Sequence, residues 1–126
     1  MCAKRTTAAA RNVFVVPFQL GGYDQNGNYV TGSKVQGNFF GTDVSGTTPI
    51  PCYGNCLLIY NQNTLIGGSG AGEGNRIGGP VGDAGMVVQG DHTVIQGNAI
   101  GTDFGGTLDL GVTQTGLRVA ASDVTI

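Results

Sequence analysis

The sequence has few charged residues and no long apolar run. Lys, Arg, Asp and Glu make up 11% of the 126 residues, whereas hydrophobic residues make up 40%. Disordered chains usually show the opposite balance, so we expect a folded chain. The six basic residues are outnumbered by eight acidic ones, which leaves no basic stripe for a nucleic-acid backbone. No apolar run approaches the roughly 20 residues that span a bilayer. We therefore predict neither a nucleic-acid partner nor a membrane span.

Two regular patterns are also missing. The chain has 24 glycines and four prolines but no Gly-X-Y period, which excludes a collagen helix. No segment carries apolar residues at positions i, i+3, i+4 and i+7 over the length of a helix, and each interior glycine would destabilise a helix by about 1 kcal/mol. The glycines are therefore expected to mark turns between short strands.

An internal repeat is present instead. The stretches "LLIYNQNTLI", "MVVQGDHTVI" and "LRVAASDVTI" begin at residues 57, 86 and 117, so they are separated by 29 and 31 residues. In addition, "VQGNFFGTD" at 35–43 recurs as "IQGNAIGTD" at 95–103, a separation of 60 residues, or two such steps. Apolar residues recur at alternate positions in each stretch, as Leu57 and Ile59 do, and a polar interruption follows them, which predicts short strands between turns. A unit of about 30 residues cannot bury its apolar face alone, so successive units must stack.

Stacking predicts parallel sheets in which equivalent side chains form columns. Three strands in each unit give a coil of triangular section, so the predicted fold class is all-β, a parallel β-solenoid. Asn38, Asn75 and Asn98 recur at one corner, where Asn tolerates the left-handed conformation and its amide can bond to the backbone or to the next Asn as a ladder. The expected inward columns are Leu57–Met86–Leu117, Ile59–Val88–Val119, Ile66–Ile95–Ile126 and Phe40–Ile77–Ile100.

These residues carry a resemblance to a known repeat family. "NTLIGGSGAGEGNRIGG" and "GMVVQGDHTVIQGNAIGTDFGGTLDLG" resemble the repeat of right-handed parallel β-helix proteins of the pectate-lyase-like superfold, in particular the bacterial proteins with tandem "GNxIGTD" units. The similarity covers about residues 28–126. It implies a right-handed β-helix and a secreted or cell-surface location, and it carries no catalytic motif.

The predicted domain organisation is a tail at residues 1–12 followed by the parallel β-helix at 13–126. A strand is expected at 13–20, and Asn26-Gly27 is a tight-turn signal that predicts a projecting hairpin at 21–30. No clear export signal is recognisable in the first residues. The repeat would demand another strand after Ile126, so we expect a longer β-helix that continues into further coils, or end-to-end self-association.

Asp43, Asp103 and Arg76 are the candidate binding residues. The repeat places the two acids in one column, two strand spacings or about 10 Å apart. This separation exceeds that of paired glycosidase carboxylates and is too long for both to ligate one calcium ion. Both "GTDVSG" and "GTDFGG" instead match a type I turn with Asp first and Gly fourth. Arg76, on an outward position of the intervening coil, could pair with either acid or contact an acidic sugar.

We therefore assign no catalytic residue. The expected function is a structural or carbohydrate-facing module without catalysis of its own, with a polysaccharide as the partner. The alternative is a polysaccharide lyase or glycoside hydrolase of the same superfold. Neither a cofactor nor a metal is predicted: Asp24, Asn26 and Asn28 resemble the start of an EF-hand loop, but Tyr29 replaces the glycine of its sharp turn. His92 is expected in a solvated turn without a functional partner.

The three cysteines leave one question open. Cys52 and Cys56 in "CYGNC" either close a small disulfide loop or remain two free thiols, depending on the redox compartment. A lone pair at this spacing does not make a zinc site. Cys2 is expected to be unpaired.

Overall fold

The computed structural model describes residues 3–4, 11–28, 30–102, 105–107, 109, 111 and 115–126. Within them every named element is a β-strand, and each strand pairing is parallel. This confirms the all-β, parallel-sheet part of the predicted fold class. The same residues contain no helical segment of the length and apolarity needed to cross a membrane.

The strands form three four-stranded sheets and one two-stranded sheet. The first sheet consists of β1 (Ala3–Lys4), β4 (Lys34–Gln36), β8 (Leu65–Gly67) and β12 (Val94–Gln96). The second consists of β2 (Val13–Phe14), β5 (Phe39–Phe40), β9 (Arg76–Ile77) and β13 (Ala99–Ile100). The third consists of β3 (Phe18–Leu20), β7 (Leu57–Ile59), β11 (Ala84–Val88) and β14 (Thr115–Val119). The pair consists of β6 (Cys52–Gly54) and β10 (Pro80–Gly82).

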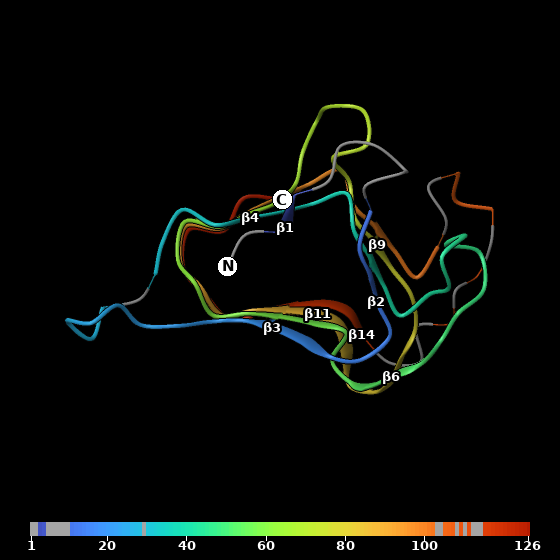
Figure 1. Cartoon of the computed structure of the whole chain (residues 1–126), viewed down its shortest axis with the longest axis horizontal. Helices are drawn as coiled ribbons and strands as arrows, with labels where there is room; N and C mark the ends of the chain where they lie inside the picture. The colour runs from blue at the N-terminus through green and yellow to red at the C-terminus, as the bar shows by residue number, and fades with distance from the viewer. Residues whose placement is uncertain are drawn as a thin grey trace.

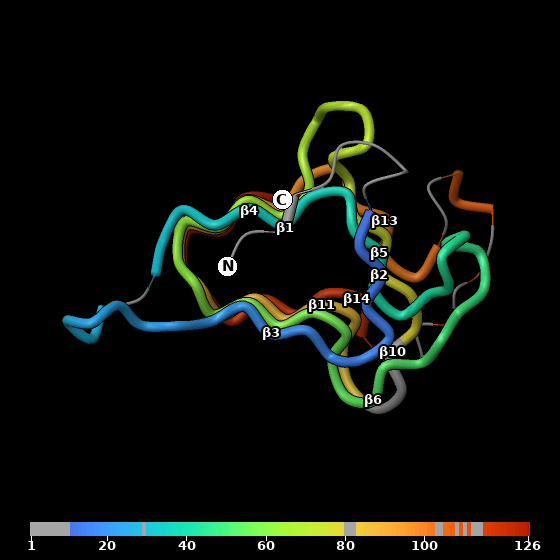
Figure 2. Tube along the Cα trace, viewed as in Figure 1, coloured from blue at the N-terminus to red at the C-terminus, as the bar shows by residue number. Residues whose placement is uncertain are grey.

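The chain visits the first, second and third sheets in turn, and this order occurs four times. Figure 1 shows the three sheets as three sides of the molecule, and Figure 2 shows successive passages of the chain superposed in that view. Two of the passages contain an additional strand, β6 or β10, between the second and third sheets. The prediction of three strands per unit did not include this pair.

Strand pairing confirms most of the predicted columns. Met86 of β11 pairs with Leu57 of β7 and with Leu117 of β14, so these three residues lie in one sheet. An isolated parallel bridge between Val94 and Thr125 extends the first sheet beyond β12. Pairing confirms the other columns in the same way: Val88 with Ile59 and Val119, Ile77 with Phe40 and Ile100, and Ile66 with Ile95. Most of these side chains form one continuous core between the sheets. Val119 and Ile126 were also predicted to point inward, but they are 38% and 78% exposed, so the prediction is wrong for these two residues.

The asparagine corner forms the predicted ladder. The backbone N–H of Asn38 donates to Oδ1 of Asn75 at 3.0 Å, and Nδ2 of Asn75 donates to Oδ1 of Asn98 at 2.9 Å. Asn12, which the sequence analysis assigned to the tail, joins the same ladder through a 3.1 Å bond from its Nδ2 to Oδ1 of Asn38. Each side chain thus bonds to the equivalent residue of a neighbouring passage, which satisfies polar groups inside the stack.

One detail of this corner was predicted wrongly. The left-handed residues are Gly37 and Gly97, with φ of 69° and 67°, and not the asparagines that follow them. Space also favours glycine at 97, because a Cβ there would collide with the carbonyl oxygen of Gly68. Glycine therefore makes the turn, and asparagine supplies the side-chain bonds.

The strand predicted at 13–20 is two strands, β2 and β3, which belong to different sheets. Pro17 lies between them and has no N–H to donate to a ladder, so the chain bends there and changes sheets. The N–H of Phe18 resumes pairing by donating to the carbonyl oxygen of Cys56 at 3.0 Å. Inside the predicted tail, β1 pairs with β4; the boundary of the domain at residue 13 stays a prediction.

The predicted hairpin at 21–30 is confirmed. The N–H of Val30 donates to the carbonyl oxygen of Gly22, and that of Gly27 donates to Asp24, both at 3.1 Å. Gly27 has a φ of 82°, which a residue with a side chain rarely adopts. In Figure 1 this segment projects from the sheets next to β3.

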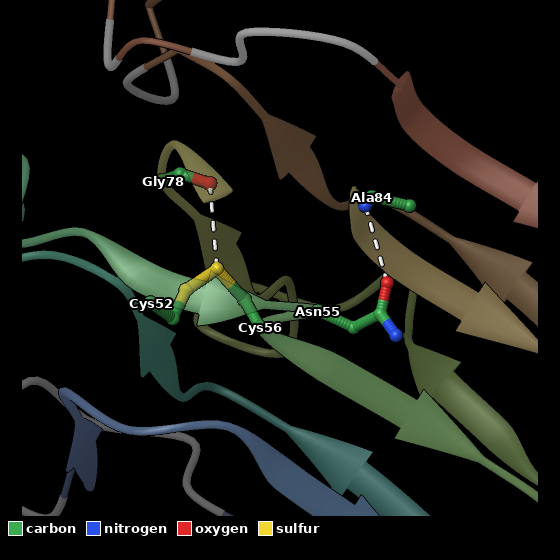
Figure 3. The surroundings of a disulfide bond; sticks show 5 residues. All are labelled: Cys52, Asn55, Cys56, Gly78 and Ala84. Atoms are coloured by element: carbon green, nitrogen blue, oxygen red, sulfur yellow. Dashed lines mark hydrogen bonds between the residues drawn. A yellow bond between two sulfur atoms is a disulfide. The ribbon is translucent and has the colours of Figure 1, made fainter. Parts of the chain in front are cut away.

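A disulfide bond joins Cys52 of β6 to Cys56, just before β7 (Figure 3). This answers the question that the sequence left open. Both cysteines are buried, with exposures of 1% and 0%. Gly41 packs against them, since a Cβ there would lie 3.0 Å and 3.1 Å from the two sulfur atoms. Inside the closed loop, the side-chain oxygen of Asn55 accepts a 3.1 Å hydrogen bond from the N–H of Ala84.

Candidate functional site

Arg76 lies on β9, where it pairs with Phe39 of β5 and Ala99 of β13. Its guanidinium stacks over the Phe39 ring, with Cζ 4.7 Å from the ring centroid. Arg11 also stacks on this ring, at 4.0 Å, and its Nε donates to the carbonyl oxygen of Gly37. Phe39 is thus in contact with two cations, an arrangement that favours planar guanidinium groups over lysine.

The side chain of Arg76 is more enclosed than its predicted outward position suggested. Only 9% of the residue is exposed. Nη1 donates to the carbonyl oxygen of Gly46 at 2.6 Å, in a hairpin that an antiparallel bridge between Thr42 and Pro49 closes. A Cβ on Gly46 would collide with Nη1 and with the Phe39 ring. Arg76 therefore holds the 42–49 hairpin against the second sheet.

Asp43 begins the turn of this hairpin, as the sequence predicted. The N–H of Gly46 donates to the carbonyl oxygen of Asp43 at 3.0 Å, so Asp stands first and Gly fourth. The carboxylate Oδ1 accepts hydrogen bonds from the Ser45 hydroxyl at 2.6 Å and from the N–H groups of Thr47 and Thr48 at 3.3 Å. The Ser45 hydroxyl, followed by these backbone N–H groups, holds the pKa of Asp43 below its ordinary value. One of its two oxygens is thus occupied in fixing the turn.

Asp103 lies outside the described residues, so its predicted 10 Å separation from Asp43 stays a prediction. The surrounding hairpin is described in part, and Thr102 forms an antiparallel bridge with Asp109. Gly106 has a φ of 69°, close to the 70° of Gly46. The structure therefore brings Asp43 and Arg76 to one hairpin.

A hollow of about 500 Å³ opens beside Arg11. Its other lining residues come from the glycine-rich loop and from the end of β12: Gly68, Ser69, Gly70, Gly72, Gly74, Gln96 and Gly97. Oε2 of Glu73 accepts a 2.8 Å hydrogen bond from the N–H of Gly70, and a Cβ on Gly68 or Gly70 would meet the Glu73 side chain. The glycines of this loop thus make room for the chain's own carboxylate.

The two remaining polar motifs also act in turns. Oδ1 of Asp24 accepts hydrogen bonds from the N–H groups of Asn26 at 2.8 Å and Asn28 at 3.0 Å, and these bonds lower the pKa of Asp24. His92 has a φ of 57°, and its Nδ1 lies 3.6 Å from Oδ2 of Asp123, with both side chains exposed. Among the described residues, no three His, Cys, Asp or Glu side chains come together as metal ligands would.

Comparison with known protein families, characterised proteins and solved structures gives no match for this chain. A functional assignment therefore rests on the fold and on the residue contacts of the chain itself.

Sequence reasoning missed two residues of this region, Arg11 and Asn12, because it assigned them to a tail. The signal was present: "RNVF" at 11–14 has the pattern of "GNFF" at 37–40, with Asn followed by two apolar residues. Val13 indeed pairs with Phe39, and Phe14 pairs with Phe40. Arg11 stands where the later copy has Gly37, so the similarity of the two segments was not recognised.

Proposed function

We propose that the chain is a right-handed parallel β-helix module of a secreted or cell-surface bacterial protein, which acts as a rigid scaffold with a carbohydrate-facing surface. One observation carries this proposal: the strands recur in three parallel sheets with equivalent residues in register, as Leu57, Met86 and Leu117 do. The cyclic visit of the three sheets supports a solenoid, because each passage contacts chiefly the passages before and after it.

Side-chain bonds along the stack support the scaffold role. The amide ladder connects four passages, from Asn12 to Asn98. Phe14 and Phe40 stack at the same end, with ring centroids 5.0 Å apart and planes at 9°. Since these contacts repeat with the backbone pairing, bending the stack would break several of them together. A stiff surface of this kind suits the binding of an extended polymer.

The outer surface supports a carbohydrate partner. Two of its hollows are lined by amide, hydroxyl, glycine and tyrosine groups, together with Arg11 in one of them. Such groups bind sugar hydroxyls and sugar rings. The disulfide between Cys52 and Cys56 supports a secreted or surface location, because such bonds persist in oxidising compartments.

Binding without turnover is the result that tests this function. The purified chain is run by affinity electrophoresis through gels that contain pectin, alginate, chondroitin, xylan or galactomannan, with and without calcium. We expect retardation in at least one gel, and no new reducing or unsaturated ends when the same polysaccharides are incubated with the chain. Absence of retardation in every gel would contradict the carbohydrate-facing role.

The same incubation separates the scaffold from the enzyme alternative. A lyase or hydrolase would release new ends, and substitution of its catalytic carboxylate would abolish them. The variant Asp43→Asn tests one predicted candidate and Asp103→Asn the other, with Asp24→Asn as the matched control, since Asp24 occupies a similar turn outside the proposed repeat. Product release that vanishes in Asp43→Asn or Asp103→Asn, but not in the control, would replace the scaffold assignment by an enzymatic one.

A further inference from the structure

A second hollow lies where the projecting hairpin leaves the third sheet. It has a volume of about 420 Å³ and is lined by Gln19, Gly21, Gly22, Tyr23 and Tyr60. Gln19 belongs to β3, and Tyr60 directly follows β7, the neighbouring strand of the third sheet. We call this hollow the tyrosine groove. Its volume falls within the range of about 300–1,000 Å³ that is usual for small-molecule sites.

The two tyrosines differ in exposure. Tyr60 is half-buried, and its N–H donates to the carbonyl oxygen of Leu20 at 2.8 Å, which continues the pairing of β3 with β7. Its ring packs against Gly21, because a Cβ there would lie 3.1 Å from Cδ2 of the ring. Tyr23 stands at the base of the hairpin and is 63% exposed. The groove thus has one half-buried aromatic wall and one exposed aromatic wall.

The glycines of the floor are not required by the backbone. Neither Gly21 nor Gly22 has a positive φ, in contrast with Gly27 at the hairpin turn. The Tyr60 ring leaves little space for a side chain at 21, which accounts for the glycine there. At Gly22 there is more space, because the nearest atom to a Cβ would be Cγ2 of Val30, 4.0 Å away. A side chain at 22 would therefore fit without a clash beside the groove, which Gly22 lines. Its absence leaves an open floor between two aromatic residues.

The lining chemistry selects the kind of ligand. The described residues that line the groove include no charged side chain, whereas the hollow beside Arg11 includes a cation. Tyrosine rings offer apolar faces with a hydroxyl at one end, and the Gln19 amide both donates and accepts hydrogen bonds. A pyranose ring presents apolar C–H faces and hydroxyl edges to such walls. An acidic sugar would find no cation among these residues.

We propose that the tyrosine groove is a subsite for a neutral sugar unit of a polysaccharide, with the ring packed on Tyr60 and Tyr23 and a hydroxyl bonded to Gln19. This inference rests on the proposed carbohydrate-facing function and narrows it to one surface and one ligand class. The groove lies at the hairpin base, away from the Asp43 hairpin that the repeat had suggested.

Tyrosine fluorescence provides the test, because the chain has four tyrosines and no tryptophan. The full chain is titrated with cellohexaose as the neutral probe and with hexagalacturonate as the charged one, and calorimetry gives the affinities. We expect a fluorescence change with cellohexaose and an affinity for it higher than for hexagalacturonate. The variants Tyr23→Ala, which removes an aromatic wall, and Gly22→Leu, which adds bulk beside the groove, are each expected to weaken cellohexaose binding about tenfold, or by about 1.4 kcal/mol.

Tyr53→Ala is the matched control. Tyr53 is 77% exposed on β6, which lies apart from the hairpin in Figure 2, so this variant should bind cellohexaose as the parent chain does. Far-UV circular dichroism checks that each variant is folded. If Gly22→Leu does not fold, Tyr23→Ala still tests the groove, because it removes an exposed side chain. Equal cellohexaose affinity in the parent chain and Tyr23→Ala would overturn the subsite.

The outcomes also separate the subsite from the function on which it rests. Retardation by acidic polysaccharides, together with no cellohexaose binding, would overturn the neutral-sugar subsite and leave the carbohydrate-facing role intact. No binding to any of the polysaccharides or oligosaccharides would overturn both.

Discussion

Two columns of polar residues run along the stack. One column repeats a residue type, and the other repeats a backbone conformation. The first is the buried ladder of Asn38, Asn75 and Asn98, joined at one end by Asn12, in which each amide bonds to the next. The second is the exposed column Asn63, His92 and Asp123, whose φ angles are 52°, 57° and 55°. In the first column the residue type is constant, whereas in the second only the backbone conformation is constant.

The backbone explains why the exposed column varies. The N–H of Asn63 donates to the carbonyl oxygen of Asp91 at 2.9 Å, and that of His92 donates to Ser122 at 3.0 Å. These bonds need a left-handed residue but no particular side chain, and Asn, Asp and His are the non-glycine residues most enriched there. A ladder of amides, in contrast, needs a donor and an acceptor in every passage, which only Asn or Gln supplies.

The same substitution in both columns gives the largest expected contrast. Asn75→Gly removes the acceptor of the buried Asn38 N–H and the donor to the carbonyl oxygen of Val35, so we expect a loss of about 3 kcal/mol in the free energy of unfolding. Asn63→Gly relieves a left-handed backbone and gives the unfolded chain more freedom, two effects that offset to within about 0.5 kcal/mol. Guanidinium chloride denaturation, followed by circular dichroism, measures both. Equal losses at the two positions would contradict the distinction between the columns.

Conformation, rather than side-chain identity, should govern the exposed column. His92→Val places a β-branched residue at a φ of 57° and is expected to cost about 1–2 kcal/mol of unfolding free energy. His92→Asn keeps a residue that tolerates this conformation and serves as the control, with an expected change below about 0.5 kcal/mol. Thermal denaturation of the two variants at pH 7 compares them. A loss in His92→Asn as large as that in His92→Val would assign the effect to the imidazole instead.

Position within the ladder should also set the cost. Asn12 stands at the end and donates one side-chain bond to Asn38, whereas Asn75 bonds to both neighbours. Asn12→Ala is therefore expected to lower the unfolding free energy by about 1 kcal/mol, less than Asn75→Gly does. The adjacent Arg11→Ala leaves the ladder intact and tests whether local packing alone is responsible. A loss from Asn12→Ala that matched Asn75→Gly would mean that the end of the ladder is as constrained as its middle.

These columns also show how far the sequence predicts the molecule. The spacing of Leu57, Met86 and Leu117 was sufficient to place them in one sheet, because alternation and stacking leave few other ways to bury them. The Asn ladder was predictable for the same reason. The burial of Arg76 was not, since its partner is a backbone carbonyl of Gly46 in a hairpin that no periodic pattern positions.

The sequence also did not predict the tyrosine groove or the β6–β10 pair, because neither follows from a periodic pattern. The groove depends on Gly21 lying against Tyr60, which are 39 positions apart in the chain. The pair aligns "CYG" with "PVG", which share only their last residue. Repetition thus reveals the parts of this chain that stack, and it reveals much less about the segments that leave the stack, where the candidate sites lie.

The smallest expected effect concerns a segment that leaves the stack, the Asp43 turn. The pKa of the Asp43 carboxyl group is lowered in the folded chain, so the folded chain binds a proton at Asp43 less readily than the unfolded chain does. The stabilisation is therefore present above the ordinary pKa of about 3.9 and is lost as the pH falls through the lower, folded value. In an NMR titration, the amide protons of Thr47 and Thr48 should shift with a midpoint below about 3.9.

Asn28 and Asn26 provide the internal comparison, since their backbone N–H groups bond to Asp24 and are the main cause of its lowered pKa, whereas at Asp43 the main cause is the Ser45 hydroxyl. Ser45→Ala removes the largest cause of the shift at Asp43 and should raise the midpoint at Thr47 without moving that at Asn26. A midpoint at Thr47 that stays unchanged in Ser45→Ala would mean that the backbone turn holds the carboxylate. Asp43 would then resemble the exposed column, in which conformation repeats and the side chain is free to vary.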